Sequence, residues 1–506
     1  MNLTGVTGKK GNHMEIIKIN PLDNVAVVLR PVLKGQKLDA GGTFVIALAD
    51  LPFGHKVALV DISEGSHAIK YGAPIGIASA NIKAGEHVHT HNLKTGLTDH
   101  VDYTYQPLLT QPEPTPQGSF IGFKRCSGRV GIRNEIWILP TVGCVNSTGE
   151  SVARKAQSLL RGSVQGVYSF PHPYGCSQLG EDHRNTQKAL CGMVHHPNAG
   201  GVLVIGLGCE NNSIEEMKIM LGYIDESRVK FLICQDYEDE LAEALRLIDE
   251  LIETAHGDKR ETVPTSELVL GLKCGGSDGL SGITANPLIG ALTDKLVTEG
   301  GSTILTEVPE MFGAETILMN RCKSEEIFNK TVMLINNFKD YFISHGQPVY
   351  ENPSPGNKEG GITTLEDKSL GCTQKAGKAT VVDVLSYGES LKTKGLNLLE
   401  SPGNDLIAST ALAVSGAHIV LFTTGRGTPF GSPVPTVKIS SNTPLYDKKR
   451  NWIDFDAGTL VGGASMEEMV DMLYEYIIKL ANGEKFTKTE ENGIRDMTIF
   501  RSGVTL

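Results

Sequence analysis

Short hydrophobic segments alternate with turn residues over the first part of the chain. Segments at 15–19, 25–29, 56–60 and 87–91 carry aliphatic or β-branched residues, and Gly, Asp and Asn separate them. Runs of this length between turn residues are typical of strands, and helical periodicity is nearly absent here. The pattern predicts a compact all-β domain over residues 14–93.

Two segments do not follow this pattern of short predicted strands. Residues 94–117 are proline-rich, which favours an extended, semi-rigid linker. Residues 1–13 are polar and glycine-rich and lack the apolar core of a secretory signal. We expect residues 1–13 to form a disordered leader, with Met14 as the natural start.

From residue 118 the pattern changes to alternating strands and helices. Near-continuous apolar runs of this kind indicate a parallel sheet covered on both faces. We expect a first α/β domain over residues 118–262. Its predicted strands are 135–140, 166–170, 201–206 and 229–234, and its predicted helices are 147–160, 181–194, 213–221 and 238–255.

Polar residues 257–266 interrupt the alternation, which then resumes. We expect a second α/β domain over residues 263–506. Its predicted strands are 268–273, 302–307, 380–385 and 418–422, and its predicted helices are 286–299, 325–344, 405–415 and 465–481. The predicted fold is therefore multidomain, with a small all-β domain followed by an α/β region of two subdomains.

Composition excludes several classes of function. The formal net charge is −11 without a long basic run, which argues against nucleic acid as a partner. No apolar stretch is long enough to span a bilayer. Nine cysteines spread over the chain fit a reducing cytoplasm better than a disulfide framework. Gly206-Leu-Gly208 lacks the third glycine of a dinucleotide fingerprint, so we expect neither NAD nor flavin.

Five cysteines stand beside a glycine where a predicted strand runs into a turn. They are Cys144, Cys176, Cys209, Cys274 and Cys372. Ligands of parallel α/β sheets bind beyond the carboxyl ends of the strands, where these residues are expected to lie. A thiolate is a soft metal ligand or a nucleophile. The alternative is a small buried residue beside a packing glycine.

The segment Gly85-Glu-His87-Val-His89-Thr-His91 carries the strongest metal-binding pattern. In a strand, alternate residues share one face, so the three imidazoles are predicted to lie together. Imidazole suits Fe, Zn, Mn, Ni or Cu. A solvated edge strand with exposed histidines is the alternative.

Further polar residues suggest proton transfer and anion binding. Twelve residues contain His172, Tyr174, Cys176 and the pair Asp182-His183. These side chains are either catalytic groups or part of a polar loop that enters a helix. Glu307 ends a predicted strand. Glycine-rich loops around Lys358 and Arg426 present backbone N–H groups and one cation each, which favours a carboxylate or phosphate ligand.

Several long motifs resemble those of the altronate/galactarate dehydratase family, over nearly the whole chain from about Met14. They are Gly-Glu-His-Val-His-Thr-His-Asn (85–92), Tyr-Gly-Cys-Ser-Gln-Leu-Gly (174–180), Val-Ile-Gly-Leu-Gly-Cys-Glu-Asn-Asn (204–212), Cys-Gly-Gly-Ser-Asp-Gly (274–279), Thr-Glu-Val-Pro-Glu (306–310), Asn-Pro-Ser-Pro-Gly-Asn-Lys (352–358) and Thr-Gly-Arg-Gly-Thr-Pro (424–429).

The resemblance implies an N-terminal SAF (β-clip) domain and a cytoplasmic hydro-lyase. The implied reaction is dehydration of D-altronate to 2-dehydro-3-deoxy-D-gluconate with a divalent metal, Fe²⁺ first and Mn²⁺ as a substitute. On this reading His87, His89, His91 and Cys176 are the predicted metal ligands. His172, Tyr174, His183 and Glu307 are the predicted acid–base groups, and Asn286, Lys358 and Arg426 hold the sugar acid. We expect the active site where the β domain meets the sheet.

Three alternatives remain open from the sequence. One is dehydration of galactarate or another sugar acid. Another is a dehydratase with an iron–sulfur cluster on Cys144, Cys176, Cys209 and Cys274, because cluster ligands are thiolates. The third is a sugar-acid sensor without catalysis. A homo-oligomer is compatible with each of them.

Overall fold

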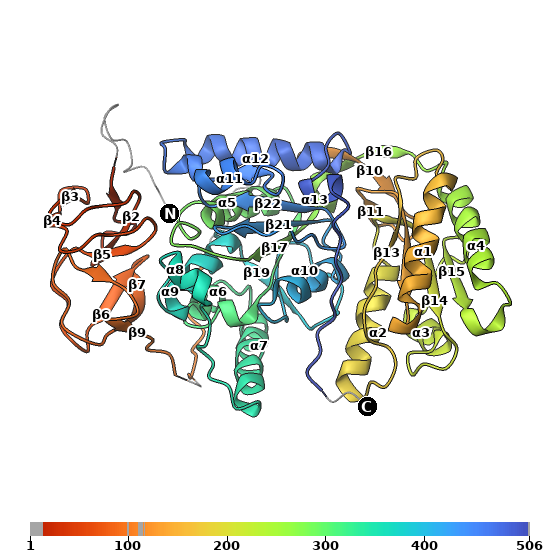
Figure 1. Cartoon of the computed structure of the whole chain (residues 1–506), viewed down its shortest axis with the longest axis horizontal. Helices are drawn as coiled ribbons and strands as arrows, with labels where there is room; N and C mark the ends of the chain where they lie inside the picture. The colour runs from red at the N-terminus through yellow and green to blue at the C-terminus, as the bar shows by residue number, and fades with distance from the viewer. Residues whose placement is uncertain (1–13, 99–100, 110–114, 116, 504–506) are drawn as a thin grey trace.

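The computed structural model describes residues 14–98, 101–109, 115 and 117–503. Figure 1 shows three parts in a row, with the N-terminal β domain and the middle α/β domain at opposite ends and the C-terminal α/β domain between them. The predicted leader, 1–13, lies outside the described residues. No described helix is long and apolar enough to cross a membrane.

The N-terminal domain consists of small antiparallel sheets around an aliphatic core. One sheet has the order β1(Ile16–Ile17), β2(Val25–Val28), β5(Lys56–Ala58) and β8(His87–Val88). The others are β3(Lys37–Asp39) with β4(Phe44–Ile46), and β6(His67–Lys70), β7(Ala73–Ala78) and β9(Leu93–Lys94). Tight turns at positive-φ glycines such as Gly85 join these short strands.

The predicted histidine strand is shorter than expected. Only His87–Val88 is a strand, and the chain then turns at Asn92. The Asn92 side chain accepts from the His89 backbone N–H (2.9 Å) and donates to the His87 carbonyl (2.9 Å). These hydrogen bonds from a side chain to the backbone replace the inter-strand hydrogen bonds that a longer strand needs.

The middle domain is built on a four-stranded parallel sheet. Its order is β13(Val167–Ser169), β12(Glu135–Pro140), β14(Ala199–Gly206) and β15(Val229–Ile233). The helices are α1(Asn146–Ala156), α2(Gly180–Val194), α3(Ile214–Leu221) and α4(Glu240–Ala255). Each lies where the sequence predicts a helix.

An antiparallel ribbon links the middle and C-terminal domains. It has the order β11(Val130–Gly131), β10(Ser119–Lys124) and β16(Arg260–Pro264). The chain therefore enters and leaves the middle domain through neighbouring strands. The polar segment 257–266 includes strand β16 rather than only a loop, and the boundary drawn at 262/263 falls inside it.

The C-terminal domain carries a seven-stranded parallel sheet. Its order is β19(Val381–Leu385), β20(Leu396–Leu399), β18(Ser302–Leu305), β17(Val269–Cys274), β21(Ile419–Thr424), β22(Thr436–Ser440) and β23(Phe455–Asp456). The helices are α5(Ala285–Thr298), α6(Glu315–Met319), α7(Glu325–Ser344), α8(Pro355–Glu359), α9(Leu365–Cys372), α10(Asp405–Val414), α11(Thr443–Lys448), α12(Met466–Ala481) and α13(Lys488–Glu491). The predicted fold, a β domain followed by parallel α/β sheets, is confirmed.

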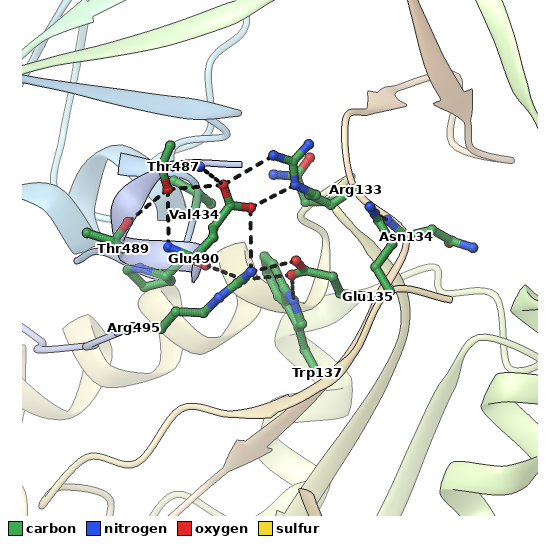
Figure 2. A network of polar contacts seen from close by, with 12 residues as sticks. Arg133, Asn134, Glu135, Trp137, Val434, Thr487, Thr489, Glu490 and Arg495 are labelled. Atoms are coloured by element: carbon green, nitrogen blue, oxygen red, sulfur yellow. Dashed lines mark hydrogen bonds and ion pairs between the residues drawn. The ribbon is translucent and has the colours of Figure 1, made fainter. Parts of the chain in front are cut away.

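Figure 2 shows a buried ionic network that ties the C-terminal segment to the middle domain. Glu490 pairs with Arg133 (2.8 Å), and Arg495 forms a two-bond fork with Glu135 (2.7 and 2.8 Å). The Trp137 indole donates to the same Glu135 carboxylate (2.8 Å). All four charged side chains are nearly inaccessible, so the network fixes the two domains against each other.

A second buried network docks the N-terminal domain on helix α9. Asp367 accepts from Lys56 (2.8 Å) and Lys70 (3.0 Å), and all three side chains are inaccessible. Lys56 also donates to the Gly361 carbonyl (2.6 Å). Two ammonium groups of one domain therefore share a single carboxylate of the other, which orients the β domain.

Candidate active site

Four histidines gather on the face of the N-terminal domain that meets the C-terminal domain. They are His55, His87, His89 and His91, and their neighbouring ring centroids are 4.9 to 5.5 Å apart. The three sequence-predicted rings thus cluster although the strand is short. His55 was missed, because only folding brings this isolated loop residue beside a segment 32 positions away.

Backbone contacts connect the histidine cluster to the predicted anion-binding loops. The His89 Nε2 lies 2.9 Å from the Lys358 carbonyl, and the His55 Nε2 lies 3.1 Å from the Glu359 carbonyl. The Glu359 carboxylate in turn accepts from Arg426 (2.8 Å). Residues far apart in sequence therefore converge where the β domain meets the C-terminal domain, and the placement of the active site there stays a prediction.

Glycines allow this close approach. The Gly279 N–H donates to the Gly360 carbonyl (2.7 Å), and a Cβ on Gly279 would stand 1.9 Å from the Gly54 carbonyl oxygen. A side chain at Gly361, whose φ is +98°, would meet the same oxygen at 2.2 Å. The glycines of these motifs hold backbone against backbone at the domain interface.

Partial burial keeps two of these half-buried rings neutral. Burial, reinforced by the neighbouring His55 and His89, lowers the pKa of His87 to about 3. Burial also lowers the pKa of His89 to about 4, with a contribution from Lys56. Near neutral pH both rings are therefore uncharged.

The metal site predicted on His87, His89, His91 and Cys176 stays a prediction, and hydrogen bonds already engage some of the ring nitrogens. The His89 Nδ1 accepts from the Thr90 N–H (2.7 Å), and its Nε2–H faces the Lys358 carbonyl, so neither nitrogen offers a free lone pair. The His55 nitrogens are likewise engaged by His87 (3.0 Å) and Glu359. Among the described residues, the one set of ligand atoms close enough to share an ion is Cys274, Glu310 and Cys372.

Asn286 lies behind this interface rather than on it. Its side chain is 1% exposed, accepts from the Thr423 hydroxyl (2.7 Å) and donates to the Gly371 carbonyl (3.0 Å). The amide lines a small cavity with Lys70, Tyr71 and Asp278. A role in substrate binding stays a prediction.

Glu307 is buried at the carboxyl end of β18 with a left-handed φ of +72°. It pairs with Lys273, accepts from the Cys274 N–H (2.9 Å) and lies 3.8 Å from Lys375. Burial raises its pKa despite these cations. Glu307 is thus embedded in an ion cluster whose Lys273 and Glu310 were not singled out as site residues from the sequence.

The other predicted catalytic residues lie in the middle domain. The His172 Nε2 faces the Pro140 carbonyl (2.7 Å), its Nδ1 accepts from the Tyr174 N–H (3.2 Å), and its ring stacks on that of Tyr174. His183 pairs with Glu216 at 3.2 Å. Cys176 is exposed in the loop between β13 and α2 of the middle domain, apart from the histidine cluster of the N-terminal domain. The structure therefore separates the predicted site into two regions.

The glycine-flanked cysteines also divide into two groups. The loops bearing Cys144, Cys176 and Cys209 follow neighbouring strands of the middle sheet, and the Gly143 N–H donates to the Tyr174 carbonyl (2.9 Å). Cys274 instead contacts Cys372 in the C-terminal domain. Cys372 ends helix α9 rather than a strand, which corrects its predicted position. The four cysteines proposed for an iron–sulfur cluster do not form one group.

Comparison with known proteins identifies the class. The SAF domain model of altronate and galactarate dehydratases matches residues 14–96. The second-domain model of D-galactarate dehydratase/altronate hydrolase matches 122–256, and the D-galactarate/altronate dehydratase C-terminal model matches 265–505. A SAF domain followed by these two regions defines a hydro-lyase.

Individual relatives match nearly the whole chain. Altronate dehydratase of Escherichia coli is 53% identical over 97% of this chain and 100% of that protein. The Bacillus subtilis altronate dehydratase is 55% identical, covering 97% of this chain and 99% of that protein. The E. coli galactarate dehydratase (L-threo-forming) is 32% identical over 95% of each. The chain belongs to the altronate/galactarate dehydratase family, which confirms the resemblance.

Proposed function

We propose that this protein dehydrates D-altronate to 2-dehydro-3-deoxy-D-gluconate and water. The observation that carries the proposal is the 53–55% identity to two altronate dehydratases over 97% of the chain, against 32% to a galactarate dehydratase. The contact of the histidine cluster with helix α8, which pairs with Arg426, supports placing the reaction at the domain interface.

The reaction needs a carboxylate anchor and groups that move protons. Arg426 is half-exposed and Lys358 lies in the neighbouring helix α8, so we propose that both cations bind the substrate carboxylate. A base removes the proton α to that carboxylate, and an acid protonates the departing β-hydroxyl. The resulting enol tautomerises to the 2-keto acid without redox chemistry.

The histidine cluster is our proposed source of the base. His87 keeps its Nδ1 after its Nε2 has bonded to His55, and His91 is exposed at the rim of the cluster. His91 is the better candidate of the two, because the lowered pKa of His87, about 3, makes that ring a weak proton acceptor. His172, Tyr174 and His183 lie in the middle domain. Their assignment to proton transfer remains a sequence-based prediction.

We further propose that turnover requires a divalent metal, Fe²⁺ or Mn²⁺. A bound metal would act as a Lewis acid that stabilises the charge developing on the substrate carboxylate. We also propose a cytoplasmic location, because all nine cysteines are free thiols.

A substrate panel tests the proposal. The purified full-length chain is incubated with altronate, mannonate, galactarate and galactonate, each with Fe²⁺, Mn²⁺ or Zn²⁺ after chelation, and keto-acid release is measured. We expect altronate to be dehydrated fastest, with Fe²⁺ or Mn²⁺. Faster release from galactarate would favour the second candidate substrate, and no keto acid from any acid would remove the enzymatic proposal.

A further inference from the structure

A buried group of soft ligands lies at the carboxyl end of the seven-stranded sheet. The Cys274 Sγ is 2.8 Å and the Cys372 Sγ 3.1 Å from the same Glu310 carboxylate oxygen, and the two sulfurs are 3.3 Å apart. These residues come from the end of β17, the turn after β18 and the end of α9. Three segments of the chain thus bring two thiols and a carboxylate to one point.

Rigid ion pairs hold this group in place. Lys368 bonds to the other Glu310 oxygen at 2.7 Å, which leaves the thiol-facing oxygen available. Lys273 bridges Glu307 and Asp405, and Lys375 lies 3.8 Å from Glu307. Glu310, Cys274 and Cys372 are each less than 5% exposed.

Charge also favours a cation at this group. Lys273, Lys368 and Lys375 pair with the carboxylates Glu307, Glu310 and Asp405. Two thiolates at the 3.3 Å sulfur–sulfur distance would repel each other in this buried group, which is costly unless a cation lies between them. A divalent cation would supply that charge.

A polar cavity beside Cys372 offers room for a further ligand. It measures about 10 Å³, enough for a single water molecule, and Lys368, Ser277 and Asn286 also line it. The Ser277 Oγ is buried and has no hydrogen-bond partner within the described part of the chain. An unpaired hydroxyl at such a cavity indicates a polar occupant.

We propose that Cys274, Cys372 and Glu310 bind one divalent metal of borderline softness, such as Zn²⁺ or Fe²⁺, with water from the cavity as fourth ligand. Two thiolates and a carboxylate suit these ions, and the open position resembles that of a catalytic rather than a structural site. Binding releases the two thiol protons to solvent. It also moves the sulfurs apart, to about 3.8 Å for a tetrahedral ion with metal–sulfur bonds of about 2.3 Å.

Cobalt titration of the reduced, metal-free full-length chain tests the site without measuring activity. We expect near-ultraviolet thiolate charge-transfer and visible d–d bands that saturate at one Co²⁺ per chain and disappear on adding Zn²⁺. The bands should be lost in Cys372→Ser and weakened in Glu310→Gln. They should persist in Cys322→Ser, a buried cysteine outside the group, and in His89→Ala.

X-ray absorption of the wild-type protein with one equivalent of Zn²⁺ covers the case in which the cysteine variants do not fold. We expect two sulfur neighbours at about 2.3 Å together with oxygen ligands. Nitrogen and oxygen neighbours only, or cobalt bands that survive Cys372→Ser but vanish in His89→Ala, would overturn the proposal. Because neither readout involves turnover, failure of this site and failure of altronate dehydration are distinguishable.

Discussion

The interpretation of His172 changes once its hydrogen-bond partners are known. Its position among prolines, a tyrosine and a cysteine suggests a proton-transfer group. In the fold it is 2% exposed and both ring nitrogens meet backbone atoms. Burial, partly opposed by the bond to the Pro140 carbonyl, lowers its pKa to about 4. The ring is therefore neutral in the folded protein at neutral pH.

This neutrality predicts acid sensitivity. The folded pKa of His172 lies below the ordinary value of 6.5, so its contribution to stability is present above pH 6.5 and is lost as the pH falls towards 4. Between pH 7 and pH 5 the loss is about 2 kcal/mol. We expect His172→Gln to lower the melting temperature at pH 7 but to flatten its dependence on pH.

Thermal unfolding monitored at pH 5, 6 and 7 checks this expectation. The matched control is His67→Gln, because His67 is exposed on the N-terminal domain. An unchanged pH dependence in His172→Gln would show that other groups cause the acid sensitivity.

The histidine cluster could be predicted only in part from the sequence. The spacing of His87, His89 and His91 predicts that their rings lie together, and they do. The spacing does not predict that His55 joins them. It also does not predict that the His89 and His55 rings contact backbone carbonyls 269 and 304 positions later in the sequence. Hydrogen bonds of this kind depend on tertiary docking, which one strand's periodicity does not encode.

Among the elements, helices with strong local signals were predicted best. Helix α7 has the predicted bounds, because Ser324 caps it by accepting from the Ile327 N–H and Gly346 follows its end. Strands β20 and β22 were missed because segments as short as Leu-Asn-Leu-Leu and Thr-Val-Lys-Ile-Ser, without flanking periodicity, are ambiguous. The short helix α9 was also missed, and with it the placement of Cys372.

Helix α9 carries the carboxylate that docks the N-terminal domain. Replacing Asp367 with Asn would leave Lys56 and Lys70 buried without a counter-charge. Breaking a buried pair in this way costs about 3–5 kcal/mol. We expect Asp367→Asn to lower the melting temperature and to make the linker around residues 94–117 more sensitive to limited proteolysis.

A surface pair provides the control for this variant. Asp471→Asn removes the partner of Lys295 in an ion pair that is largely exposed, so its effect should stay below about 1 kcal/mol. Equal effects of the two variants on stability and on linker cleavage would contradict the docking role of Asp367.

At the scale of the whole molecule, two buried ionic networks fasten opposite ends of the C-terminal domain. One holds the N-terminal domain through Asp367, and the other holds the middle domain through Glu490 and Arg495 (Figure 2). They share no residue, so each interface is expected to loosen independently.

Glu490→Gln tests this independence. It leaves the nearly inaccessible Arg133 guanidinium without its carboxylate partner. We expect faster hydrogen exchange at residues 487–500 and at the start of β12, and a loss of about 3–5 kcal/mol in stability. Exchange in the N-terminal domain should remain at the wild-type rate. Faster exchange there would show that the two interfaces are coupled.

The central claim is that altronate is dehydrated where the N-terminal and C-terminal domains meet. Its most direct test is kcat/KM for altronate in Arg426→Gln, compared with Arg161→Gln, which removes a guanidinium from a surface ion pair of the middle domain. Loss of a hydrogen bond to a charged group costs about 1.5–3 kcal/mol, or about 10–100-fold in kcat/KM. We expect that loss in Arg426→Gln and a wild-type value in Arg161→Gln. Unchanged kcat/KM in Arg426→Gln would contradict the placement of the active site.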